Sequence, residues 1–110
     1  MTVLMHAAAG GNATCFKLVV QVVQWAFTED QMDEYLLLVS ADDRTLLMFA
    51  AQSSDPSTFI ECAAVLRRTV KPRDFRISIG RVDNEGRNLL MHAVTGGSGS
   101  YSTRLVKDYV

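Results

Sequence analysis

Apolar residues recur along this chain in a pattern that repeats after 43 residues. Three segments, residues 2–8, 45–51 and 88–94, share an aliphatic pair followed by Met, a ring-bearing residue and Ala. Each segment opens with Thr or Asn, whose side-chain oxygen can accept a hydrogen bond from a free backbone N–H at a helix start. The pattern predicts a short first helix in each of three units, over about Thr2–Ala9, Thr45–Gln52 and Asn88–Thr95.

A longer second helix is expected in each unit, after a polar or glycine-rich turn. Phe16, Val20 and Val23 recur at three- and four-residue steps, the period of an amphipathic helix. Adding 43 to these numbers again gives apolar residues, with no gap needed across the first interval. The spacing predicts helices over about Ala13–Ala26 and Ser57–Thr69, and a third copy that starts near Tyr101 and is cut off at Val110.

An extra segment of 13 residues follows each second helix, over about 28–40 and 71–83. Thr28 with Gln31 forms a capping-box pattern, and Pro72 suits the first turn of a helix. The alternation in residues 76–79 is also compatible with a strand. We favour a short third helix here, and a strand is the alternative.

Composition agrees with a single folded domain over residues 1–110. The chain is 48% hydrophobic with a formal net charge of −1, which disfavours both disorder and a nucleic-acid-binding surface. Its one basic run, at residues 67–76, is expected to be a solvated helix end. Units of about 1–40, 41–83 and 84–110 are predicted, the last truncated, as part of a longer array. The absence of a signal peptide and of a framework of paired cysteines favours an intracellular, cytoplasmic protein.

Residues 83–94 resemble the opening of an ankyrin repeat. Asp83, Gly86, Leu90 and Ala93 match that family's Asp-x-x-Gly-x-Thr-Pro-Leu-His-x-Ala-Ala motif, and the likeness extends over the whole chain. The usual Pro is missing, the histidines lie one position late, and the period is 43 rather than about 33 residues. The resemblance implies an all-α fold, an α-solenoid of helix-turn-helix repeats with an extra short helical segment per repeat. Armadillo and HEAT repeats are the alternative, because their period is close to 43.

The sequence offers no convincing catalytic, cofactor or metal-binding constellation. Gly96–Gly99 lacks the Lys and Ser/Thr of a phosphate-binding loop. His6 and His92 occupy equivalent positions, and Phe49 takes that place in the middle unit, so we expect packed rings with nitrogens bonded to backbone. Cys15 and Cys62 are expected in the core. We therefore expect no enzyme, no cofactor and no bound metal.

The predicted function is a protein–protein interaction module that binds a partner protein through its concave face. In ankyrin-type proteins, as the resemblance implies, that face is lined by inter-unit turns and first helices. The candidate contact residues are Asp42, Asp43, Arg44, Gln52, Asn84, Glu85, Arg87 and Thr95. No nucleic-acid or membrane partner is expected, whereas neighbouring repeats or self-association could cover the C-terminal end. The alternatives are a structural spacer within a larger protein and an armadillo- or HEAT-like adaptor.

Overall fold

Helices account for nearly all of the regular structure in this chain, which we describe from a computed structural model over residues 2–53 and 55–96. Within these residues there are seven helices and no strand beyond an isolated bridge between Val82 and Asn88. The helices are α1 (Val3–Ala9), α2 (Ala13–Ala26), α3 (Glu29–Leu37), α4 (Leu46–Gln52), α5 (Pro56–Thr69), α6 (Pro72–Ile79) and α7 (Leu89–Gly96). The radius of gyration is 12.5 Å, close to the roughly 13 Å expected of a compact domain of this length.

The helix boundaries repeat as the sequence predicts. The first residues of α1, α4 and α7 are 43 apart, and both ends of α2 and α5 are offset by the same interval. The extra segment forms a helix in both copies, α3 and α6, so the strand alternative is wrong. The second helix predicted near Tyr101 lies outside the described residues.

Polar caps determine where these helices begin. The Thr2 hydroxyl accepts a hydrogen bond from the Met5 N–H at 3.1 Å, and the Met5 sulfur accepts one from the Thr2 N–H at 3.5 Å. Thr45 and Met48 repeat both contacts, at 3.3 and 3.5 Å. The predicted capping box of Thr28 and Gln31 is present at the start of α3. Each cap satisfies backbone N–H groups that have no partner within the helix.

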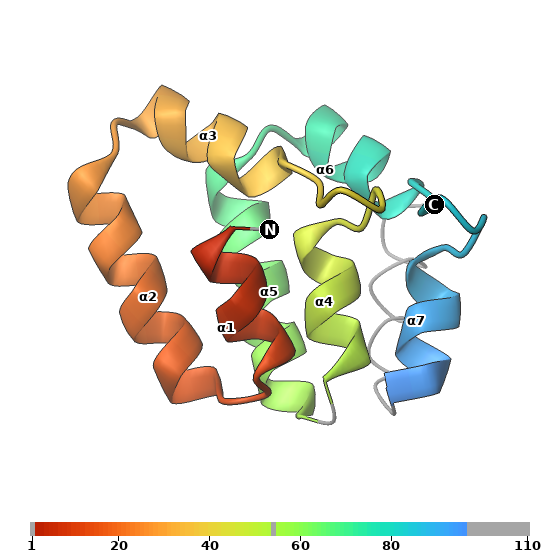
Figure 1. The fold of residues 1–110 in the computed structure, drawn as a ribbon. Coiled ribbons are helices and arrows are strands. Elements are labelled where there is room, and N and C mark those ends of the chain that lie inside the picture. Colours follow the sequence, from red (N-terminus) through yellow and green to blue (C-terminus); the bar gives the residue numbers. More distant parts are fainter. Residues whose placement is uncertain (1, 54, 97–110) are drawn as a thin grey trace.

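The short first helices stand side by side, with α4 between α1 and α7 (Figure 1). The longer α2 packs against α1 and α5, and α5 also packs against α4. The extra helices lie together across one end of the molecule, where α3 packs on α2 and α5 and α6 packs on α5. This arrangement leaves α4 enclosed, since every residue from Leu46 to Ala51 is buried.

Burial differs between equivalent positions, which overturns some expectations. Cys62 is buried as predicted, but Cys15 is exposed. Met5 and Met48 belong to the core, whereas the equivalent Met91 is exposed. Trp25 is almost fully exposed on α2. A sequence period identifies equivalent positions, but the exposure of each position depends on which neighbour covers it.

Candidate functional site

Two five-residue turns join the units, and both adopt one conformation. In the first, Ser40 N–H donates to Arg44 O at 2.9 Å, and in the second Asp83 N–H donates to Arg87 O at the same distance. The Ser40 hydroxyl accepts from the Arg44 N–H, as the Asp83 carboxylate accepts from the Arg87 N–H. A single side chain therefore shapes each turn from its first position.

Each turn contains one residue with a positive φ, at equivalent positions. Asp43 has φ 65° and Gly86 has φ 78°. Glycine adopts this left-handed conformation without a steric penalty, and Asp tolerates it better than most residues. A further hydrogen bond of 3.0 Å, from the Asn84 N–H to the Asp42 carbonyl, ties the second turn to the first. The turns consequently form one continuous structure, which we call the turn ridge (residues 40–44 and 83–87).

A chain of buried polar contacts anchors the turn ridge to the first helices. Asp83 Oδ2 lies 2.9 Å from His92 Nε2, and His92 Nδ1 lies 2.7 Å from Gln52 Nε2. Arg44 Nη1 donates to Gln52 Oε1 at 3.0 Å. These contacts join the second turn, α7, α4 and the first turn in one network. His92 and Asp83 are both buried, so their polar atoms depend on these partners.

The network defines the tautomer of His92. Gln52 accepts from Arg44 through its oxygen, so the group facing His92 is the Gln52 amide NH₂, which can only donate. His92 Nδ1 is therefore the acceptor, and Nε2–H donates to Asp83. We expected the ring nitrogens to bond to backbone, but both bond to side chains. The equivalent His6 is exposed, so its predicted packing role is wrong.

Hydrogen bonds also keep the two turn carboxylates ionised. Burial opposes ionisation of Asp83, but the N–H groups of Arg87 and Glu85, followed by His92 and the Arg87 guanidinium, lower the pKa of Asp83 below its usual value. The Ser40 hydroxyl contributes most to lowering the pKa of Asp42, and Arg44 adds to its effect. Both turns thus retain a negative charge beside an arginine.

The eight predicted contact residues divide into two groups. Arg44 and Arg87 are partly covered: Arg44 Nε lies 2.9 Å from Asp42 Oδ2, and Arg87 Nη2 lies 3.0 Å from Glu85 Oε2. Gln52 is occupied by His92 and Arg44, and the exposed Thr95 donates its hydroxyl to the Met91 carbonyl. Among the predicted contact residues in the ridge, Asp43, Asn84 and Glu85 are exposed and Asp42 is partly exposed.

Asp83 and His92 were not predicted as site residues, although a signal was available. Residues 43 apart occupy equivalent positions, so Asp83 corresponds to Ser40 and His92 corresponds to Phe49. An uncharged pair in the middle unit is thus replaced by a hydrogen-bonding Asp and His in the later unit. In the middle unit, the Arg44 guanidinium carbon lies 5.8 Å from the centre of the Phe49 ring. Gln52 lies 40 residues from His92, and no local pattern connects them.

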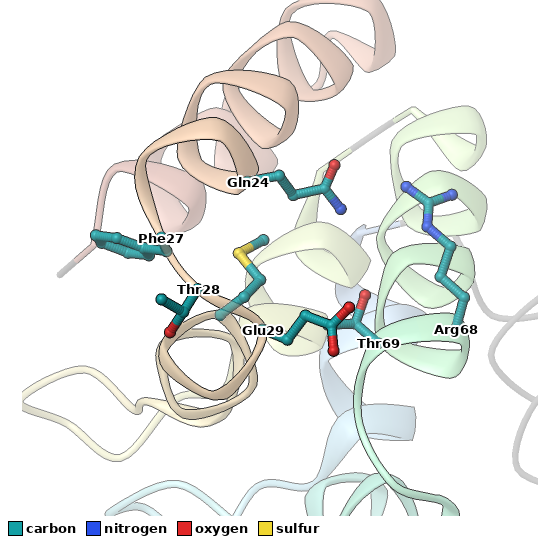
Figure 2. A pocket seen from close by; sticks show the side chains of 7 residues that line it. Gln24, Phe27, Thr28, Glu29, Arg68 and Thr69 are labelled. Carbon is teal, nitrogen blue, oxygen red and sulfur yellow. The ribbon is translucent and has the colours of Figure 1, made fainter.

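An open cleft of about 470 Å³ lies away from the turn ridge, between the ends of α2 and α5 and the start of α3 (Figure 2). The side chains of Gln24 and Arg68 face it from opposite walls, and Glu29 extends between them (Figure 2). Phe27 at its rim packs edge-on against Tyr35, with the ring centres 5.1 Å apart. The cleft combines both charge signs with apolar surface from Phe27 and Met32, so its lining does not select one ligand class.

Other candidate chemistry is scattered over the described part of the chain. The five basic residues of the run at 67–76 are all exposed. Among the described residues, no three His, Cys, Asp or Glu side chains are grouped to hold a metal ion. None of the helices in residues 2–53 and 55–96 is long and apolar enough to cross a membrane. Comparison with protein-family models, curated proteins and solved structures gives no significant match.

Proposed function

We propose that this chain is a protein-binding module of ankyrin-like helical repeats and that the turn ridge contacts the partner. The observation that carries the proposal is the shared conformation of the two turns, which are linked to each other and to α4 and α7. A surface held in its bound conformation loses little conformational entropy on association. The ridge is therefore suited to binding without rearrangement.

The contact surface we propose is narrower than the one expected from the sequence. The residues of α4 from Leu46 to Ala51 are buried, so this first helix offers little surface to a partner protein. Gln52 and the two arginines support the ridge through intramolecular contacts. The exposed side chains that remain for a partner are those of Asp43, Asn84 and Glu85.

The partner surface should be basic. Asp43 and Glu85 carry exposed negative charge, and Asp42 remains ionised beside them. Arg44 pairs with Asp42 and Arg87 with Glu85, but the carboxylates of the two turns outnumber the arginines, so the ridge keeps a net negative charge. Complementary charge raises the association rate and selects among partners, and its effect weakens with added salt. Binding should accordingly decrease as ionic strength rises.

Quantitative affinity capture from cell extract can test this proposal. The ridge variant Asp43→Asn/Asn84→Lys/Glu85→Lys keeps a residue that tolerates positive φ at position 43. The control variant Asp30→Lys/Glu34→Lys changes the net charge equally on exposed positions of α3. We expect a set of proteins retained by the wild type and the control to be lost with the ridge variant. Equal retention by all three proteins would refute a binding role for the turn ridge.

A structural spacer is the second candidate, and the open faces at the two ends of the helix row favour it. Val3 and Val22 are exposed at one end, and Met91 and Val94 are exposed at the other. A spacer would show no ridge-dependent capture, and its loss would alter only the arrangement of attached segments. The capture comparison therefore separates the two functions.

A further inference from the structure

The first helices differ in exposure at one set of equivalent positions. Val3 of α1 is 54% exposed, whereas its counterparts Leu46 and Leu89 are 3% and 2% exposed. His6 is likewise exposed, whereas Phe49 and His92 are buried. In each case the residue in the first unit is open and both later copies are covered.

The second helices show the same difference. Cys15 and Val22 of α2 are exposed, the latter at 65%, while their counterparts Thr58 and Val65 of α5 are buried. Leu18 and Trp25 are large apolar residues exposed on the same side of α2, where α5 carries the partly buried Glu61 and the exposed Arg68. We call this surface the front face (Val3, His6, Cys15, Leu18, Val22 and Trp25).

Two contacts identify what covers these positions in the later units. His92 bonds to Gln52 of the preceding first helix at 2.7 Å. Glu61 forms an ion pair of 3.4 Å with Lys17 of the preceding second helix. Positions equivalent to His6 and Leu18 thus face the preceding unit. The front face is the continuation of the established interface between units, and it is unoccupied within this chain's described residues.

The opposite end of the row of first helices shows the complementary pattern. Met5 and Ala8 of α1 are buried, as are Met48 and Ala51 of α4. Their counterparts in α7, Met91 and Val94, are 50% and 76% exposed. Figure 1 shows α1 and α2 at one end of the row and α7 at the other. One molecule therefore exposes both an apolar front face and an apolar rear surface.

We propose that a second copy of this chain binds the front face with its α7 end, so that the row of helices continues from one molecule into the next. Each copy covers a face that the described residues of the other leave exposed, and apolar side chains are removed from water on both sides of the contact. The contact is head-to-tail, since different surfaces meet. Such contacts leave a free surface at each end and permit further addition.

Sedimentation equilibrium of the 110-residue chain tests this proposal, over roughly 1 µM to 1 mM, a range that covers interfaces of moderate strength. We expect the average mass to rise with concentration beyond that of a dimer. Val22→Lys should weaken association at least about tenfold, because a buried valine contributes about 1.5 kcal/mol and each 1.4 kcal/mol is tenfold. Emission of Trp25, the chain's only tryptophan, should shift to shorter wavelength as wild-type association proceeds.

Two further variants distinguish a head-to-tail contact from other kinds of association. Val94→Lys should weaken association as Val22→Lys does, whereas an equal mixture of the two variants should form a 1:1 dimer that grows no further. The control is Ile77→Lys, which places the same charge on an exposed branched aliphatic residue of α6. This variant should associate as the wild type does. Circular dichroism of each variant establishes that the helices are intact.

Three results would overturn the proposal. The wild type could remain monomeric throughout the concentration range. Val22→Lys could associate as strongly as Ile77→Lys, which would place the contact elsewhere. Val94→Lys could associate normally while Val22→Lys did not, which would indicate a front-to-front dimer instead of a head-to-tail contact.

Discussion

Replacing His92 by phenylalanine tests whether its hydrogen bonds stabilise the fold. The repeat provides the control, because an equivalent histidine is exposed in the first unit. His92→Phe introduces the residue that the middle unit already carries at this position. The variant removes the bonds to Asp83 and to Gln52. A hydrogen bond contributes about 1 kcal/mol net, and a buried polar group left without a partner costs more. The additional apolar ring surface offsets part of this loss, so we expect His92→Phe to lower the free energy of unfolding by about 2 kcal/mol.

The matched control is His6→Phe, which makes the same substitution at an equivalent but exposed position. It should change the free energy of unfolding by no more than about 0.5 kcal/mol. Urea denaturation followed by circular dichroism measures both variants against the wild type. A drop in Tm of roughly 10 °C should accompany His92→Phe in a chain of this size. If His92→Phe were as stable as His6→Phe, the ring would only fill space, and the network would not anchor the turn ridge.

Three further predictions follow from burial and backbone geometry. Met48→Ala should destabilise the protein by about 2–5 kcal/mol in urea denaturation, whereas Met91→Ala should be nearly neutral because that methionine is exposed; similar losses would contradict the assigned burial. Gly86→Ala should cost about 1–2 kcal/mol. The cost comes from its φ of 78° alone, since a Cβ there would meet no atom within 4 Å. Gly80→Ala should be tolerated, because Gly80 has a φ of −80° and room for a Cβ. Because the folded-state pKa of Asp83 is lowered, its ionisation stabilises the fold above pH 3.8, and this contribution disappears as pH falls through the lower folded-state value. Asp83→Asn should therefore flatten the acid limb of stability against pH, and an unchanged limb would refute the pKa assignment.

The sequence predicted the helices well because their determinants are local. Thr2 and Thr45 cap helices within three residues of themselves, and the apolar spacing of Phe16, Val20 and Val23 lies within one helix. Because the pattern repeats every 43 residues, a helix assigned in one unit also predicted the equivalent helix in the next unit. The extra segment remained ambiguous between helix and strand because residues 76–79 fit both periods over so short a stretch.

Exposure and side-chain pairing were predicted less well because they depend on distant neighbours. Cys15 lies among apolar residues and was expected in the core, but no segment of the described residues covers it. The partner of His92 is 40 residues away in sequence, and its identity depends on how α4 and α7 stand beside each other. Six of the eight predicted contact residues do lie in the two inter-unit turns, since Asn, Asp and Gly residues mark turns locally.

Mapping a captured partner onto the protein by NMR tests the proposed binding role most directly. Amide resonances of the labelled chain are compared before and after addition of a partner that the capture comparison identifies. We expect the largest shifts on residues 42–44 and 84–87, with α3 and α6 little affected. Largest shifts at the cleft residues Gln24 and Arg68, with an unperturbed turn ridge, would refute binding through the ridge.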